Sequence, residues 1–453
     1  MLDLIRDPTM NRRHSEKNSK RFYWLIALPL QSLCLTVFAG PLYGFNALVQ
    51  PFNQVFSPSN INNGFSGAVV GGTIFLSLGL GGLAHNRLLQ IFGRTTLFIG
   101  SNLGLIASFG IAAAACHWKL YWLLIVGFAI PTGICFVNLF FIGIVFLVAW
   151  GHHTGRVGLS TGTAGMMFGL WGAIFSIVGP YLQAHLGFTW MLILSGIAVA
   201  TIELSALFFM IDPPPAEATQ TDMDTDQAKP TLTFGDVIRF PSIWVFGFFI
   251  FLFLTPGFGF KLIVAALSNE VFHTTDLVAS WMAAAFLICY GASRLGFGIL
   301  SDRLAIKPMY LTFSLVQVVA LLIAAITLPW VTGVLFFTVL MCLTGTMFAG
   351  GKCLWAVAMV RMFGQKNFHT PMMLTQPFVG AAGFLGPITL TWALRASDVK
   401  SSVTIWLFAS AAALLIATIL FHMLRKFDYD KFSKHQAQGL ELSLRARTEF
   451  DKF

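Results

Sequence analysis

Residues 120–149 read LYWLLIVGFAIPTGICFVNLFFIGIVFLVA, thirty positions without one acidic or basic side chain. A helix needs about 20 mostly apolar residues to cross the hydrocarbon core of a bilayer. This run exceeds that minimum, which is typical of a helix that crosses at a tilt. It predicts a membrane-spanning helix and therefore a membrane protein.

Further apolar runs lie on both sides of this one. The expected spans are 22–46, 65–85, 96–115, 120–149, 157–182, 189–211, 239–266, 278–300, 310–328, 332–358, 372–393 and 402–424. Charged residues make up only 10% of the chain and hydrophobic residues 56%, whereas a soluble protein carries roughly 25% charged residues. We therefore expect an all-α polytopic membrane protein with 12 transmembrane helices.

The basic residues are distributed unevenly between the two sides of the membrane. Of the 28 Lys and Arg, 22 lie on the side of the N-terminus, and Lys119, Arg395 and Lys400 lie on the other. Cytoplasmic loops carry the excess of Lys and Arg, so both termini are expected in the cytoplasm. The first run lacks a small-residue cleavage site and is expected to remain as a span. These features predict an integral protein of the cell membrane, the inner membrane in a bacterium.

A long polar segment divides the chain into two halves. It is acidic and contains prolines, which is typical of a flexible linker. The expected parts are a cytoplasmic N-terminal tail (1–21), a six-helix bundle (22–211), the cytoplasmic linker (212–238), a second six-helix bundle (239–424) and a cytoplasmic C-terminal tail (425–453).

Several function classes are excluded by composition and motifs. The net charge of +9 arises from loops and tails between apolar runs, which argues against a nucleic-acid partner. The six cysteines show no metal-ligand spacing, and neither a metal nor a cofactor is expected. No GxxxxGK[ST] motif is present, so ATP-driven transport is not expected. No His, Ser or Asp set of catalytic composition lies within the runs, so the chain is not expected to be an enzyme.

The two halves repeat each other in sequence. A glycine-entered basic turn follows the second run (GGLAHNR, Gly81–Arg87) and the eighth (GFGILSDR, Gly296–Arg303). The fifth run contains Gly179-Pro180 near its end, and the eleventh contains Gly386-Pro387. Two related six-helix halves are typical of transporters that rock around a central site.

These turns resemble the loop signature of the major facilitator superfamily. The second copy keeps its Gly298, Asp302 and Arg303, whereas the first has His85 or Asn86 where an Asp is expected. The resemblance implies two pseudo-symmetric six-helix bundles and alternating access. It also implies that Asp302, Arg303 and Arg94 hold the cytoplasmic helix ends in the outward-facing state. The contact that holds the cytoplasmic helix ends of the N-terminal half is therefore expected to be weaker or built differently.

Three stretches are similar to the oxalate/formate antiporter and monocarboxylate transporter group. They are WGHHTGRVGLSTGTAGMMFG (150–169), YGASRLGFG (290–298) and Phe363-Gly364 followed by the eleventh run. In that group an Arg in the eighth span binds the substrate carboxylate, which implies this role for Arg294. The oxalate antiporter has a second basic residue in span 11, where this chain has Val379. Oxalate itself is therefore not implied.

Four ionisable residues lie inside the runs, where charge is costly and usually functional. Arg294 lies eight residues, and Lys352 nine residues, before the charged residue at the end of its span. The two spans run in parallel, so the two side chains are expected at similar depth. Two like charges are expected to need an anion, or Glu203, between them. The alternatives are an Arg that snorkels to the interface and a Lys amine bonded to backbone carbonyls.

The other two ionisable residues, Lys261 and Glu203, suggest gating and proton coupling. Lys261 follows the TPGFG stretch (255–259), which is expected to break or bend its helix. It could serve an outer gate or snorkel to the outer surface. Glu203 is the only acid within a run, either a proton-carrying carboxyl group or a structural partner of a neighbouring helix.

Uncharged polar residues complete the expected binding site. In the resembled fold their spans line the central cavity, although each alone could be a packing residue. The candidates are Tyr43, Asn46, Asn138, Tyr290, Trp355 and Gln376.

The sequence predicts a monomeric secondary active transporter in the lipid bilayer. It is expected to move a small organic anion, a mono- or dicarboxylate, by rocker-switch alternating access, with a counter-anion or proton as a possible partner. The alternative is a proton-coupled symporter of a neutral or zwitterionic metabolite. The short cytoplasmic segments leave no room for a signalling domain, which argues against a receptor.

Overall fold

The structure is a computed structural model, and it describes residues 28–56, 65–154, 156–208, 234–239, 241–330, 333–363 and 368–423. Every regular element within these ranges is a helix. The expected tails lie outside the described residues. So does most of the expected linker, whose last residues form the short helix α12 (Phe234–Ile238).

Eleven helices in these ranges are long and apolar enough to cross a membrane. Most of them begin and end within a few residues of the predicted runs, since both follow the length of apolar sequence that a bilayer requires. Their bounds are α5 (Ser66–Phe92), α6 (Arg94–Trp118), α8 (Ile130–Thr154), α9 (Val157–Leu186), α10 (Phe188–Ser205), α13 (Pro241–Phe272), α14 (Asp276–Ser301), α15 (Ile306–Thr327), α16 (Val334–Phe363), α17 (His369–Leu394) and α18 (Val399–Met423). The clearest difference is at α5, which continues to Phe92, so the predicted turn at Gly81–Arg87 is wrong and these residues are helical.

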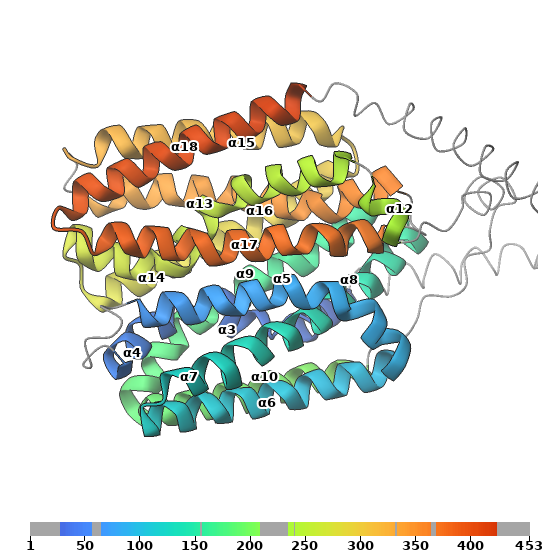
Figure 1. Cartoon of the computed structure of the whole chain (residues 1–453), viewed down its shortest axis with the longest axis horizontal. Coiled ribbons are helices and arrows are strands. Elements are labelled where there is room, and N and C mark those ends of the chain that lie inside the picture. Colours follow the sequence, from blue (N-terminus) through green and yellow to red (C-terminus); the bar gives the residue numbers. More distant parts are fainter. Residues whose placement is uncertain are drawn as a thin grey trace, which may run out of the picture.

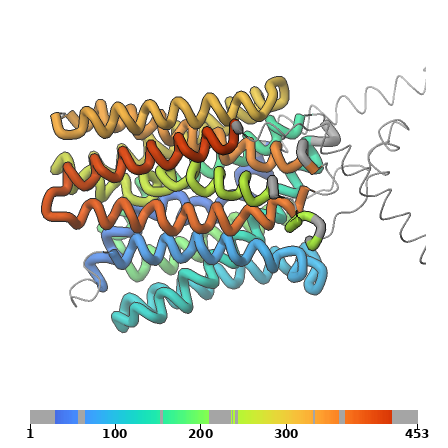
Figure 2. Tube along the Cα trace, turned by 45° about the horizontal axis from the view of Figure 1, so that its top comes forward, coloured from blue at the N-terminus to red at the C-terminus, as the bar shows by residue number. Residues whose placement is uncertain are grey.

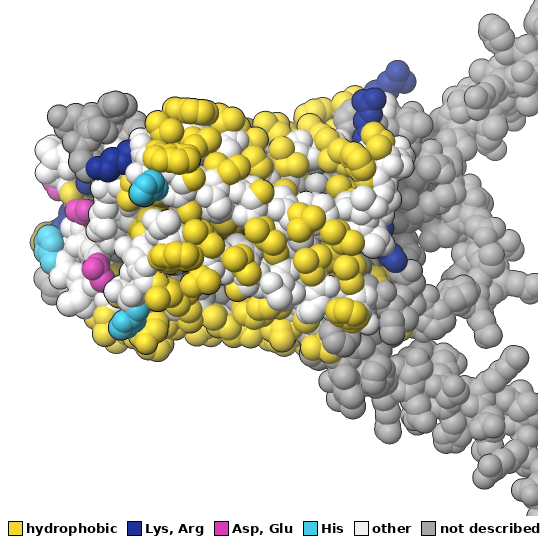
Figure 3. Space-filling model, turned by 90° about the horizontal axis from the view of Figure 1, so that it is seen from below, with side chains coloured by type: hydrophobic (Ala, Val, Ile, Leu, Met, Phe, Trp, Pro, Cys, Tyr) yellow, Lys and Arg dark blue, Asp and Glu magenta, His cyan; other side chains and the backbone are white. Residues whose placement is uncertain are grey.

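Three shorter elements extend these helices. The span containing α8 starts with α7 (Tyr121–Leu123) and a π-helical segment, η3 (Leu124–Ala129). A 3₁₀ turn, η4 (Ala206–Phe208), follows α10. Figure 3 shows a broad hydrophobic surface along the side of the molecule, with the charged side chains at its two ends. This distribution is that of an integral membrane protein.

The first predicted span differs from the expectation of one helix over 22–46. It consists of α2 (Leu28–Cys34), α3 (Ala39–Tyr43) and α4 (Asn46–Phe56), and it continues ten residues further. Bonds of the i→i+3 type replace α-helical bonds at both breaks, for example from Gly40 N to the carbonyl of Val37. Pro41 and Gly40 within α3, and Gly44 directly after it, disfavour a continuous helix here.

The stretch 255–259 was expected to break or bend its helix, and the break is wrong, because α13 runs through this stretch with Pro256 inside it. The two glycines there lie in close packing contacts. A Cβ at Gly257 would collide with the ring of Phe348 in α16, and one at Gly259 would lie 3.0 Å from Trp406 in α18. The glycines therefore allow α13 to pack closely against both helices.

Two helix pairs make most of the contacts between the N-terminal helices (α2 to α10) and the C-terminal helices (α13 to α18). These pairs are α9 with α14 and α5 with α17, and Figures 1 and 2 show α5 lying beside α17. Glycines face each other at both crossings. A Cβ on Gly169 would lie 2.5 Å from the Cα of Gly291, and one on Gly79 would lie 2.8 Å from the Cα of Gly380. Such contacts bring the backbones together, as small residues do in membrane proteins.

Candidate functional site

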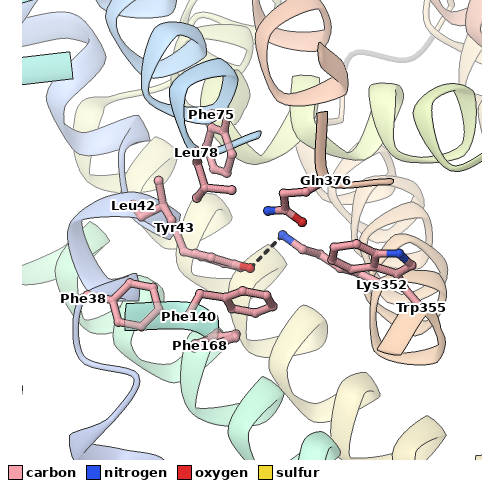
Figure 4. Close-up of a pocket in the computed structure, with 10 residues that line it drawn as sticks. All are labelled: Phe38, Leu42, Tyr43, Phe75, Leu78, Phe140, Phe168, Lys352, Trp355 and Gln376. Carbon is pink, nitrogen blue, oxygen red and sulfur yellow. Dashed lines mark hydrogen bonds between the residues drawn. The ribbon is translucent and has the colours of Figure 1, made fainter. Parts of the chain in front are cut away.

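Three basic side chains from the C-terminal helices converge on Tyr43 of α3. The amine of Lys352 donates a hydrogen bond of 3.0 Å to the Tyr43 hydroxyl (Figure 4). The amine of Lys261 lies 3.3 Å from the centre of the same ring. Arg294 donates to the hydroxyl of Tyr290 at 3.3 Å, and this hydroxyl donates to that of Tyr43 at 3.4 Å. We call these five residues the cation cluster.

The helices position these groups through simple rules. Tyr290 and Arg294 are four residues apart on α14 and therefore share one face. Lys261 comes from the middle of α13 and Lys352 from α16. Room for the guanidinium comes from α9, because a Cβ on Gly165 would collide with Nε of Arg294. The cluster thus lies where the N-terminal and C-terminal helices meet.

The cation cluster is buried and lacks acidic partners in the described part of the chain. Lys261 is 1% exposed and Arg294 is 4% exposed. Within that part, the amine of Lys261 and Nε of Arg294 have no hydrogen-bond acceptor. Burying an unpaired charge is costly. An anion would supply what these donors lack.

Aromatic rings compensate the cations in part. The Lys261 amine lies 4.5 Å from the centre of the Phe75 ring and 5.1 Å from that of Phe258. The Arg294 guanidinium lies 5.2 Å from the centre of the Phe168 ring. Cation–π contacts of this kind contribute about 0.5–2 kcal/mol each. This is less than the cost of burying a full charge, so the rings compensate these basic groups incompletely.

A pocket opens beside Lys352, which is half-buried. Figure 4 shows the Gln376 side chain pointing toward the same space as the Lys352 amine. The Oε1 atom of Gln376 lacks a described partner, whereas Nε1 of Trp355 donates to Thr375 at 2.9 Å. The lining residues are Phe38, Leu42, Tyr43, Phe75, Leu78, Phe140, Phe168, Lys352, Trp355 and Gln376. An apolar pocket with a few polar groups is typical of a small-molecule site.

Three predicted site residues lie elsewhere. Asn46 accepts a hydrogen bond from Ser176 at 3.0 Å, and Asn138 lies 2.9 Å from Nδ1 of His85. Glu203 is fully buried in α10, which packs mainly against α6 and α9, and its oxygens have no partner among the described residues. The structure does not bring these three side chains into the cation cluster.

Two of the predicted gating residues, Asp302 and Gly298, lie at the end of the molecule where α14 stops. The Asp302 carboxylate accepts hydrogen bonds from the backbone N–H groups of Gly158 (2.8 Å) and Leu159 (3.1 Å), at the start of α9. A carboxylate is stabilising at a helix N-terminus. Gly298 lies directly against Gly158, where a Cβ would collide. Asp302 therefore joins the two sets of helices.

The other two gating candidates are exposed at the same end. Arg94 begins α6, and Arg303 follows Asp302 in the turn. Lys261, also predicted to gate, lies in the cation cluster and does not reach the outer surface.

The phenylalanines of the site were not predicted, although Tyr43, Tyr290 and Trp355 were. Phe75, Phe168 and Phe258 surround the basic side chains, but the chain has 46 phenylalanines, most of them in the apolar runs. No spacing separates those that line the site from those that face lipid. Proximity to a buried Lys or Arg was the available signal, but it arises between helices and is not visible in the sequence.

A membrane bundle with a buried polar site between two sets of helices defines a membrane transporter. A model of the Major Facilitator Superfamily matches residues 31–387, so the chain belongs to this superfamily. It is a secondary transporter and not an enzyme. A search of curated protein sequences gave no match.

Solved structures with the same fold are distant in sequence. The human organic anion transporter MFSD10 (TETRAN) is 14% identical, with a TM-score of 0.63 over 89% of this chain and 99% of that one. The fucose:proton symporter FucP of E. coli is 13% identical, with a TM-score of 0.59 over 88% of this chain and 98% of that one. These similarities show the fold alone.

Proposed function

We propose that this chain is a secondary active transporter of a small organic anion, a mono- or dicarboxylate, that works by rocker-switch alternating access. One observation carries the proposal. Arg294 and Lys352 are linked through Tyr290 and Tyr43 between the two sets of helices, and no acidic side chain in the described ranges pairs with them.

The substrate carboxylate would bind between these two cations. A guanidinium presents parallel N–H groups that match a carboxylate, whereas an ammonium acts as a compact charge. Arg294 would therefore orient the anion, and Lys352 would hold it from the pocket side. Gln376 and Trp355 line the remaining wall and would contact the rest of the substrate.

Transport requires the two sets of helices to rock about this site. The glycine crossings allow one set to move against the other, and the bonds from Asp302 to α9 close one end. We expect this end to face the cytoplasm, because the excess of Lys and Arg lies on the same side. Binding of the anion would neutralise charge between the halves and favour the movement, in exchange for a counter-anion or together with a proton.

The test is a thermal-shift screen of the purified full chain against mono- and dicarboxylates. We expect some carboxylates to stabilise the wild type, and binding to weaken at least about tenfold in Arg294→Ala. Arg395→Ala, which removes an exposed charge between α17 and α18, is the matched control and should behave as the wild type. The proposal is wrong if no carboxylate stabilises the protein or if Arg294→Ala responds equally.

A proton-coupled symport of a neutral or zwitterionic metabolite is the second candidate. The observation that favours it is Glu203, a buried carboxyl group without a described hydrogen-bond partner. Uptake into proteoliposomes should then be driven by a pH gradient and be lost in Glu203→Gln. Uptake that depends on a counter-anion inside the vesicles, and survives Glu203→Gln, would support anion exchange instead.

A further inference from the structure

Lys261 is the cation that the proposed binding of one carboxylate leaves unused. Its amine carries three donors, yet it faces the ring of Tyr43 at 3.3 Å and has no acceptor among the described side chains. We propose that Lys261 is a subsite for a second carboxylate of the substrate, and that the ring of Tyr43 covers this subsite in the present conformation. This inference rests on the proposed function of the same site.

The two lysine amines lie close enough to serve one molecule. Both are within 5.3 Å of the centre of the Tyr43 ring and within 5.1 Å of the centre of the Phe258 ring. Lys352 approaches the hydroxyl end of Tyr43, whereas Lys261 lies over its face. A short dicarboxylate that replaced the phenol could therefore place one carboxylate at each amine.

The charge balance favours a dianion. Three cations surround Tyr43, and a monoanion bound between Arg294 and Lys352 would leave Lys261 buried without an acceptor. Its amine would keep only the aromatic rings as partners, which compensate a charge incompletely. A second carboxylate would give it a charge-assisted hydrogen bond, the stronger kind.

Tyr43 is placed where it can move aside. It ends α3, a five-residue helix with breaks on both sides. Displacing its ring therefore does not require a long helix to unwind. On binding, Lys352 would exchange the phenol oxygen for a carboxylate oxygen, and the ring would leave the face of the Lys261 amine. Tyr43 thus acts as an internal ligand that the substrate replaces.

The test measures binding of two matched pairs of ligands, acetate with malonate and propionate with succinate, to the purified full chain at constant ionic strength. We expect the wild type to bind the dianion at least about tenfold more tightly than the monoanion. Lys261→Met should weaken binding of the dianion at least about tenfold more than binding of the monoanion, and so remove most of this preference. Lys119→Met, which removes an exposed charge between α6 and α7, should keep the full preference.

Two variants of Tyr43 test whether its ring covers the Lys261 subsite. Tyr43→Phe keeps the ring over Lys261 but loses the bond to Lys352, so monoanion binding should strengthen and the dianion preference should remain. Tyr43→Leu removes the ring, so dianion binding should strengthen most. If carboxylates bind but Lys261→Met keeps the dianion preference, the Lys261 subsite is wrong and the anion site stands. If no carboxylate binds the wild type, both proposals fail.

Discussion

The two helix crossings between the N-terminal and C-terminal helices carry segments of related sequence but different chemistry at one end. After α14, Asp302 bonds to the backbone of α9 in the other set of helices. At the matching position, which lies within α5, His85 bonds to Asn138 of α8 within its own set and stacks on Phe141. Only the first of these contacts has to break when the two sets separate.

The two crossings therefore differ in the interactions that a rocking movement would have to break. The α9–α14 crossing carries an electrostatic bond across the interface, whereas the α5–α17 crossing relies on packing at the same position. His369, the first residue of α17, is near enough to interact electrostatically with His85. A histidine here cannot supply the negative charge that a helix N-terminus prefers.

Of the three substitutions, Gly298→Ala should have the largest effect on stability and transport. Its Cβ would collide with the backbone of Gly158, and overpacking of this kind costs about 1–3 kcal/mol. We expect a lower midpoint of thermal unfolding and loss of transport. Gly296→Ala is the matched control, because nothing lies within 4 Å of a Cβ there. Equal behaviour of the two variants would show that the backbones do not approach closely at this crossing.

Asp302→Asn should have an intermediate effect. It removes the charge that caps α9, which is worth about 1 kcal/mol, and so shifts the population toward the form open at this end by about fivefold. Distances between spin labels on α9 and α14 would report the shift. Asp398→Asn weakens a cap within the C-terminal helices, where Asp398 bonds to Ser401, and should leave these distances unchanged. A shift of the same size in both variants would contradict a bond specific to the crossing.

His85→Asp should have the smallest effect on the movement between the two sets of helices. The bond to Asn138 is lost, at about 1 kcal/mol, and the new carboxylate has a burial cost because His85 is only 1% exposed. The N–H groups at the start of α17 offset these costs only in part, so we expect a lower unfolding midpoint and shorter spin-label distances between α5 and α17. His85→Ala, which loses the bond without adding a charge, should leave these distances unchanged. Unchanged distances in His85→Asp would mean that the segments at the two crossings are not equivalent.

The positions of the helices could be predicted from the sequence because lipid imposes a minimum apolar length on each span. Tyr290 and Arg294 could be placed on one face because helical spacing is local. Tyr43, Tyr290, Arg294 and Lys352 were assigned to one site through the family resemblance. The contacts with Tyr43 could not be predicted, because they join residues more than two hundred positions apart. Lys261 was expected near an outer gate, since its depth along α13 was visible in the sequence but its neighbours on α3 were not.

The two breaks in the first span were not predicted, for a related reason. Hydropathy registers apolar residues, and the segments at the breaks are as apolar as the helices beside them. What fixes their conformation is packing against other helices, including the close approach of Gly44 to Gly172 of α9. Asn138 shows the same limit, because it was assigned to the substrate site and bonds to His85 instead.

The divided first span also bears on how the chain assembles during synthesis. A helix in three pieces leaves backbone groups that a continuous helix would satisfy within itself. One such carbonyl, that of Leu33, accepts a hydrogen bond of 2.9 Å from Nε1 of Trp171 in α9. Since α9 leaves the ribosome after the first span, this hydrogen bond can form only when a later helix arrives beside it.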